Sequence, residues 1–477
     1  IVFTAEADPM DGSWGPEMGG SWGGLIILGN APVNSNSTNT GTAPDIEGLI
    51  EGVPAFVGDL AKYGGNVSDD NSGILKYVSI RFSGSELADN SEINGLTLGA
   101  VGNGTTIDHV EIFACSDDAV EWFGGTVNAK NLVSAYGGDD GFDYDEGWEG
   151  KGQFWFHIAA EVANNDFEAD NGGEHDGELN NQGGNIGGGT VYNATYLGNR
   201  TGGGFALRIR DNAYAVYKNS IFGGWSQAVR IEPDSGPRIG AANSPIDISN
   251  NIWYDFAGTT AADLAHGNTA DTLGAGGTDI DDDESFLWSN AALSNSIEDP
   301  LLNGDSRGNL DGGNKFASVD GMLDPRPVSS SPALTNALAD LPEGETFLQE
   351  VSYQGAFSKD HNWLDGWTYL SQAGFLAESQ APDGEVFNVS ARAPLAVGQN
   401  LIPGFTILGT KTVLIRAVGA KLADFGVGTP MADPMMTLFK TSFDGSPNEL
   451  IATFDDWSEV NAVEIAATMA YIGLFPF

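Results

Sequence analysis

Residues 74–82 read ILKYVSIRF, a short run in which apolar and polar side chains alternate. Similar runs follow at 95–98 (GLTL) and 107–113 (IDHVEIF), and again at 153–156 and 206–209. Each run is rich in β-branched and aromatic residues, and Gly, Asn and Asp, which favour turns, separate the runs. The pattern predicts short β-strands and few helices before about residue 360.

The runs recur with an asparagine at a similar place in each unit. Asn131, Asn193, Asn219 and Asn250 precede small or apolar residues, in segments that begin at 130, 192, 218 and 249. Imperfect repetition with loops of variable length is typical of a solenoid. A β-sandwich would instead need tight hairpins, and Asn-Gly turns between paired strands are few here. We therefore expect a right-handed parallel β-helix whose corner asparagines hydrogen-bond neighbouring coils as a ladder.

The composition excludes two classes of partner. Lys and Arg total 20 against 66 Asp and Glu, which gives a formal net charge of -46. Such a chain repels phosphate backbones and anionic membrane surfaces, so we expect neither nucleic acid binding nor membrane insertion. The acidity is compatible with a solvated surface in salty water, with Ca²⁺ sites, or with protection against aggregation.

Three observations bear on location. The single cysteine, Cys115, lies in an apolar run and is expected to be a buried thiol without an internal disulfide partner. No stretch has the length and apolar character of a membrane span. The chain begins with Ile1-Val2-Phe3-Thr4, which resembles a strand already under way, so we expect a processed chain whose export signal lay upstream. The predicted location is extracellular or at the cell surface.

We expect two domains. Residues 1–376 form the β-helix, with a loop-rich end and a short helix around Trp363 and Trp367 that covers the open end of the solenoid. Residues 377–386 resemble a linker, and residues 387–477 a smaller β-sandwich-like domain. Its strands are predicted at 386–390, 401–408, 412–418 and 435–439, with a helix at 459–471.

Several motifs resemble a known family. They are residues 21–32 (SWGGLIILGNAP), 117–127 (DDAVEWFGGTV) and 139–148 (DDGFDYDEGW), together with the ending at 355–367. This set is similar to a family of secreted bacterial parallel β-helix proteins, mostly surface-associated and of unassigned activity, over roughly residues 1–376. Residues 413–419 (VLIRAVG) and 432–434 resemble a C-terminal β-domain appended to many exported bacterial proteins. The resemblance implies an all-β fold and a location outside the cell.

Acidic residues in two of these motifs form the most specific local signal. They lie about one coil apart, and residues one coil apart in a solenoid stack at the strand spacing of about 4.8 Å. Stacked carboxylates repel one another, so a cation such as Ca²⁺ or a neutralising network is expected. Turn-capping or solvated aspartates and a catalytic site are the alternatives. The candidate metal ligands are Asp117, Asp118, Asp139, Asp140, Asp143 and Asp145.

A catalytic reading needs partners for these carboxylates. Many parallel β-helix proteins cleave acidic polysaccharides, and His175, Arg208, Arg210 and Arg230 are candidate partners. No recognisable catalytic motif accompanies the Asp-Asp pairs, and fold analogy alone is a weak argument. We expect the arginines to pair with acids along the coil and His175 to lie in a loop. Trp122, Trp148, Trp155 and Trp225 could stack on sugars, but we expect most of them in the core.

The leading hypothesis is a non-catalytic extracellular structural or adhesive protein that self-associates, in the extreme as a filament. The alternative is a polysaccharide-degrading enzyme, a lyase or a glycosidase, or a carbohydrate-binding protein on the same scaffold. A polysaccharide partner is compatible with both hypotheses.

Overall fold

The protein was examined as a computed structural model, in which the chain divides into two compact units, Ile1–Ser379 and Gln380–Phe477. In the first unit the structure describes residues 1–34, 47–50, 58, 60–85, 93–159, 171–176, 188–200, 204–210, 213, 215–231, 246–256, 260, 264, 281–307, 309–310, 316–318 and 321–377. In the second unit it describes residues 415, 417, 419–425, 428–440 and 449–454. No helix among these residues has the length and apolar composition needed to cross a bilayer.

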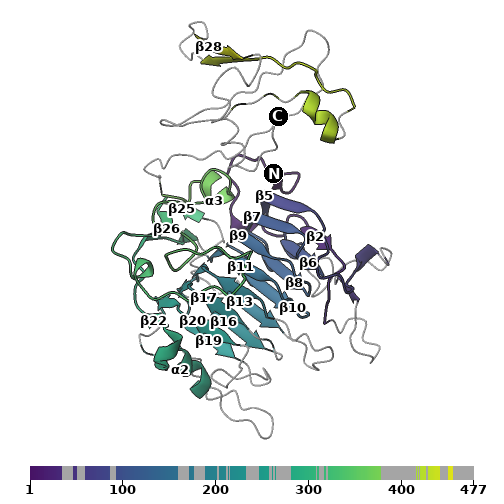
Figure 1. Ribbon diagram of the computed structural model, residues 1–477. Coiled ribbons are helices and arrows are strands. Elements are labelled where there is room, and N and C mark those ends of the chain that lie inside the picture. The colour runs from purple at the N-terminus through teal and green to yellow at the C-terminus, as the bar shows by residue number, and fades with distance from the viewer. Residues whose placement is uncertain are drawn as a thin grey trace. The chain divides into compact units, whose positions relative to one another are not determined.

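The first unit is a right-handed parallel β-helix, as the sequence predicts. Its first face is a sheet of seven parallel strands, one from each successive coil (Figure 1). In spatial order they are β2 (Leu25–Leu28), β6 (Leu96–Gly99), β8 (Val120–Phe123), β10 (Phe142–Asp145), β13 (Gly173–Asp176), β16 (Phe205–Arg210) and β19 (Gln227–Ile231).

The other two faces belong to one thirteen-stranded sheet that bends around a corner of the coil. In the early coils β5 (Ile74–Arg81), β7 (Thr106–Phe113) and β9 (Ala129–Ala135) continue across the corner. In later coils the same path is split into strand pairs, β11 (Lys151–Gln153) and β12 (Phe156–Ile158), β14 (Thr190–Tyr192) and β15 (Thr195–Leu197), β17 (Val216–Lys218) and β18 (Ile221–Gly223), and β20 (Asp247–Ser249) and β21 (Ile252–Tyr254). The prediction of one strand at 153–156 is therefore wrong, because this segment turns the corner between β11 and β12.

One column of residues forms this corner in all these coils. Its members share a left-handed backbone conformation, with φ between 52° and 60°, and they are Tyr77, His109, Asn131, Phe154, Asn193, Asn219 and Asn250. Asparagine tolerates this conformation better than most residues, which explains why it recurs at this position. The predicted corner asparagines are thus confirmed.

The predicted ladder of side-chain hydrogen bonds between the corners is confirmed only in part. Asn193 accepts from Gln153 Nε2 (3.1 Å) and donates to the carbonyl oxygen of Asn219 (3.4 Å). Asn219 and Asn250 instead donate to the carbonyl oxygens of Ala339 (3.1 Å) and Ala337 (3.0 Å). These last two bonds leave the coils and reach a later segment of the chain.

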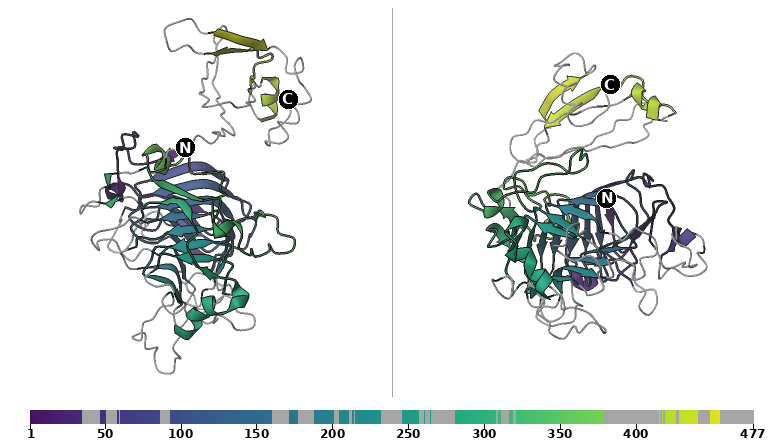
Figure 2. Two further views of the ribbon diagram at one scale, coloured as in Figure 1. Left: turned by 90° about the vertical axis from the view of Figure 1, so that its left-hand side faces the viewer. Right: turned by 60° about the horizontal axis from the view of Figure 1, so that its bottom comes forward.

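That later segment, residues 321–377, is here called the strap, because it runs back along the outer side of the coils (Figure 2). It covers an apolar face that includes Phe113, Phe156 and Ile221, and it contributes apolar side chains such as Phe357 and Leu364. Its one α-helix, α3 (Tyr369–Gln372), packs on β5 and β7, and the buried Glu111 accepts the backbone N–H groups of Tyr369 (2.6 Å) and Leu370 (3.2 Å).

Two predictions about the end of the solenoid are corrected by these elements. The helix expected around Trp363 and Trp367 is only the four-residue α3, and both tryptophans lie in turns before it. The last coil is instead covered by α2 (Asp281–Ser289), whose Leu287 is buried in the core and whose Glu284 accepts the Ile231 N–H (2.6 Å). No clear sequence pattern marks α2, because its apolar positions are few.

Aromatic side chains fill the coil interior. Trp122 stacks on Tyr144 (5.1 Å between centroids) and on Trp155 (5.3 Å), and Trp148 and Trp225 are also buried. These tryptophans therefore belong to the core and present no surface to a sugar. The thiol of Cys115 is buried in the same core, as predicted.

The remaining described elements are short. In the first unit they are β1 (Val2–Phe3), β3 (Gly48–Leu49), β4 (Lys62–Tyr63), β22 (Ser296–Ile297), β23 (Leu302–Asp305), β24 (Asn309–Leu310), β25 (Phe316–Ser318), β26 (Leu323–Pro327) and 3₁₀ turns at Pro16–Met18, Ala291–Leu293 and Pro332–Leu334. The second unit has a 3₁₀ segment, Ala420–Phe425, and an antiparallel pair, β27 (Met436–Lys440) with β28 (Glu449–Phe454). β27 matches the strand expected at 435–439, whereas the strands expected at 386–390, 401–408 and 412–418 and the helix at 459–471 lie largely or wholly outside the described residues.

Candidate metal centre

Strand alternation places one column of charged side chains on the outer side of the seven-stranded sheet. In β8 and β10 the aromatic residues Trp122 and Tyr144 point into the core, so their neighbours Glu121 and Asp143 in the same strands point outward. In-register pairing then aligns Glu121, Asp143, Glu174, Arg208 and Arg230 in consecutive strands. We call this set the outer column. Three carboxylates are followed by two guanidinium groups along it.

A second column lies at the turn that leads into these strands. Asp118 accepts the backbone N–H of Asp140 in the next coil (2.9 Å), and Asp140 accepts the N–H of Asn171 (2.8 Å). Asn171 in turn accepts the N–H of Phe205 (2.9 Å). We call Asp118, Asp140 and Asn171 the corner ladder, because each side chain extends the hydrogen bonding of the sheet around the turn.

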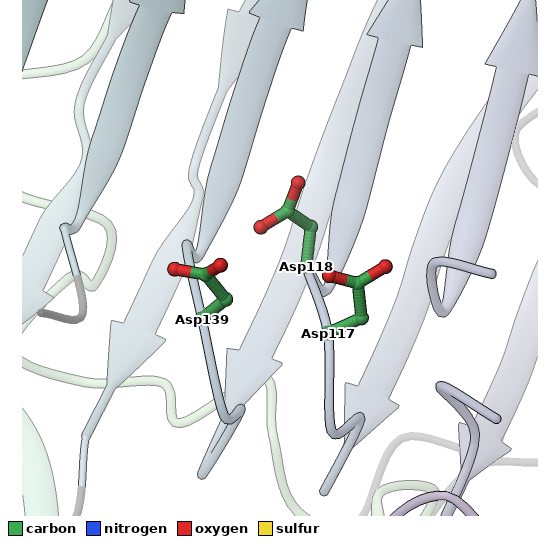
Figure 3. Close-up of side chains that lie close together, drawn as sticks. All are labelled: Asp117, Asp118 and Asp139. Atoms are coloured by element: carbon green, nitrogen blue, oxygen red, sulfur yellow. The ribbon is translucent and has the colours of Figure 1, made fainter. Parts of the chain in front are cut away.

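Carboxylates around Asp118 form two groups, each of which could hold a metal ion. One group is Asp117, Asp118 and Asp139, and the other is Asp118, Glu121 and Asp143; within each group the nearest carboxylate oxygens lie within 4.8 Å of one another. Figure 3 shows Asp117 and Asp118 on one turn and Asp139 on the neighbouring turn. Asp118 belongs to both groups, so it lies at the centre of the candidate site.

The electrostatics of the site are unfavourable without a cation. Burial raises the pKa values of Asp118, Asp140 and Asp143 well above the usual value for aspartate, and neighbouring carboxylates raise them further. For Asp143 the largest neighbouring charge is Glu174, and for Asp118 it is Asp143. Asp143 Oδ1 is shielded from solvent and accepts no hydrogen bond from the described residues. A cation would satisfy this oxygen and offset the repulsion.

The structure brings together four of the six predicted ligands, Asp117, Asp118, Asp139 and Asp143. Asp140 is buried nearby in the corner ladder, and Asp145 accepts the N–H of Glu146 (2.6 Å); neither joins the two groups. Sequence reasoning missed Glu121. The signal was available, since Glu121 stands between Val120 and Trp122 as Asp143 stands between Phe142 and Tyr144 one coil later.

The candidate catalytic partners do not face the cluster as free groups. His175 lies in β13 and not in a loop, which corrects the prediction, and its ring stacks on Tyr144 inside the core (4.2 Å). Its Nε2 lies 3.0 Å from the Tyr217 hydroxyl, and burial lowers its pKa to about 3. Arg208 and Arg210 pair with Glu174 and Asp176, as expected. Neither lysine nor an outward histidine occurs in β8, β10, β13 or β16.

The chemistry of the donor set fits a hard cation. Carboxylate oxygens without sulfur or imidazole ligands favour Ca²⁺ or Mg²⁺ over transition metals. Ca²⁺ takes about six to eight oxygens in flexible geometry, which suits side chains contributed by several coils and leaves positions for a ligand.

Comparison with known proteins gives a family and a fold. The family model described as "Pectate-lyase like beta helix domain" matches residues 1–281, more than half of the chain. Among solved structures, the crystal structure of pectate lyase Pel9A aligns with 12% sequence identity and a TM-score of 0.28, over 61% of this chain. The alignment covers 66% of that chain, just under two thirds of its length. No curated protein matches the sequence significantly.

Proposed function

Because the chain belongs to the family of pectate-lyase-like β-helix domains, we propose that it is a non-catalytic extracellular protein that adheres to acidic polysaccharide through Ca²⁺. The ion is placed beside Asp118, with ligands drawn from the two carboxylate groups that share this residue. The face of the seven-stranded sheet is then the binding surface.

The observation that carries the proposal is the composition of the corner ladder. Asn171 accepts the next coil's N–H at 2.9 Å, and Asp118 and Asp140 perform the same task at 2.9 and 2.8 Å. The ladder therefore works with a neutral amide. Two carboxylates at these positions add only buried negative charge, which destabilises the fold unless a cation compensates it. A structural role alone does not account for aspartate at both positions.

The choice of ligand follows from charge. A chain with a net charge of -46 repels an anionic polymer, so direct contact would be unfavourable. A Ca²⁺ ion with open coordination positions reverses the local sign and can be shared between the protein and the carboxylates of a uronate polymer. Binding should consequently be lost completely in chelator.

The absence of a suitable base supports binding without cleavage. Elimination or hydrolysis needs a group that can take or give a proton close to the bound sugar. On β16 the basic candidates for elimination, Arg208 and Arg210, are held by Glu174 and Asp176, and the carboxylates near Asp118 that hydrolysis would use are assigned to the ion. The alternative, a degrading enzyme, remains as an outcome of the test.

The test compares binding of Ca²⁺ and of polygalacturonate by the unmodified chain, Asp118→Asn and Asp360→Asn. Asp118→Asn keeps the ladder oxygen and removes the charge, whereas Asp360 lies in the strap, exposed and paired with Lys359, so Asp360→Asn is the control. We expect Asp118→Asn alone to lose both ligands in calorimetric titration. Equal Ca²⁺ affinity in the three proteins would refute the metal site, and release of unsaturated or reducing sugar ends would establish the enzyme instead.

A further inference from the structure

The outer column changes sign between its third and fourth positions. Glu121 and Asp143 lie beside Asp118 in the candidate Ca²⁺ site, and Glu174 follows in register with Asp143 one strand later. If the next position were also acidic, the row of carboxylates would continue from Glu174 to β16. The next residue in register is Arg208, not another acid.

Glu174 is fully engaged by neighbouring donors. Arg208 Nη1 lies 3.1 and 3.3 Å from its two carboxylate oxygens, and Arg210 Nε lies 3.1 Å from Oε1. Asn171 Nδ2 donates to the carboxylate as well, at 2.8 Å. Only 6% of the surface of Glu174 is exposed, so these donors surround most of its carboxylate.

Asp176, two residues further along β13, is held in the same way. Arg210 is its in-register neighbour in β16 and donates to it through Nε (2.8 Å) and through Nη2. The planar guanidinium group thus spans Glu174 and Asp176, which lie on the same side of the strand. Glu174 and Asp176 are the nearest acidic charges to Asp143 on this side, and both are paired with guanidinium groups.

We propose that Arg208 and Arg210 are built-in counter-ions that take the place of a second Ca²⁺ and so set the boundary of the metal centre. This inference rests on the proposed function of the Asp118 site and assigns its extent. The arginines neutralise Glu174 and Asp176 permanently, whereas the carboxylates around Asp118 are left for an exchangeable ion. A ligand bound through Ca²⁺ is therefore anchored at β8 and β10 and not along the whole sheet.

The test is the double variant Arg208→Gln/Arg210→Gln, which leaves Glu174 and Asp176 uncompensated. We expect it to bind one Ca²⁺ more per chain than the unmodified protein in calorimetric titration. Its melting temperature should fall in chelator and recover in Ca²⁺, because the ion replaces the lost charges. The control adds Glu174→Gln and Asp176→Asn to the double variant; with all four side chains neutral, it should bind as many ions as the unmodified protein.

The outcomes separate this inference from the proposed function. A double variant that binds no additional Ca²⁺, or that fails to fold even in Ca²⁺, overturns the role of the arginines. If the unmodified protein binds no Ca²⁺, the proposed function is wrong, yet a gained ion in the double variant that is absent from the control still establishes the arginines as its substitutes.

Discussion

The side chain of Asp140 accepts a backbone hydrogen bond and also changes how the stability of the fold depends on pH. Its Oδ1 accepts the Asn171 N–H. Burial raises its pKa most, and the neighbouring carboxylates of Glu174 and Asp118 raise it further. The folded state therefore holds a proton on Asp140 more readily than the unfolded state does. In chelator, stability should increase as the pH falls through this raised pKa toward the ordinary value of 3.8, and should be lowest where the carboxylate is ionised in both states.

Asp140→Asn isolates this effect, because the amide keeps the hydrogen bond that Asn171 makes at the equivalent position. In chelator at pH 7 we expect the variant to be more stable than the unmodified chain, by on the order of 1 kcal/mol. Its stability should also change less between pH 7 and pH 4. Urea unfolding at several pH values measures both quantities, and a variant that is less stable at pH 7 would show that the buried charge is already compensated.

His175 contributes a pH dependence of the opposite sign. Its folded-state pKa of about 3 lies below the ordinary histidine value of 6.5, so only the unfolded state binds a proton between these values. Stability should fall as the pH drops from 6.5 toward 3, by about 2 kcal/mol between pH 6.5 and pH 5. His175→Phe, which keeps a ring beside Tyr144, should remove this slope in urea unfolding; an unchanged slope would mean that His175 becomes protonated in the folded state.

Among the elements, the alternating strands and the asparagine corners were readable from the sequence, whereas the corner at Phe154 and the returning strap were not. β5, β7 and β16 coincide with predicted runs, and the carboxylate stack followed from the coil period. The corner at Phe154 was missed because in this coil a phenylalanine, not an asparagine, adopts the left-handed conformation. The spacing of Trp363 and Trp367 indicated a helix, but it reflects a turn in which Trp367 Nε1 donates to the Trp363 carbonyl (2.6 Å).

The attachment of the strap to the corner column could not be predicted, because it joins residues far apart in sequence. Asn219 donates to the Ala339 carbonyl (3.1 Å) and accepts the Ala339 N–H (2.7 Å). Gln153 makes the same pair of bonds with Gln349, at 2.7 Å each. Side-chain amides thus bind the strap backbone as a neighbouring strand would, which fixes its register along the coils.

Asn219→Asp tests this attachment with little change in shape. Aspartate tolerates the left-handed conformation, with φ 56° at this position, but it cannot donate to Ala339. We expect a loss of about 1–3 kcal/mol in the free energy of unfolding, since the partly buried Ala339 carbonyl loses its donor and faces a carboxylate. Asn219→Gly, which keeps the backbone conformation and removes both bonds, is the comparison. Unfolding free energies equal to that of the unmodified chain would show that the apolar contacts alone hold the strap.

For the whole molecule, self-association stays a prediction. The last coil is covered by α2, through Leu287 and Glu284. Axial contact at that end would therefore require displacement of α2. Light scattering and electron microscopy over a range of protein concentrations test the prediction; particles that remain monomeric with and without Ca²⁺ and polysaccharide would remove the filament from the proposed function.

The family match and the folded unit end at different places, and this difference leads to the last prediction. The matched region ends at residue 281, but the outer face formed by Phe113, Phe156 and Ile221 is buried only because the strap covers it. Without the strap these side chains, together with further apolar residues of the same face, would form a continuous exposed patch. Patches of more than a few hundred Å² are rare on soluble monomers and promote aggregation.

A chain truncated after residue 281 should consequently aggregate or unfold, whereas a chain that ends at residue 379 should be soluble and unfold cooperatively. A milder version is Leu364→Asp in the full chain, because Leu364 is a side chain of the strap that is fully buried against this face. A buried, unpaired carboxylate at this site should cost several kcal/mol and expose part of the face. Size-exclusion chromatography and thermal unfolding compare the three proteins. A monomeric, cooperatively unfolding 1–281 chain would show that the coils are stable by themselves and that the strap is an accessory.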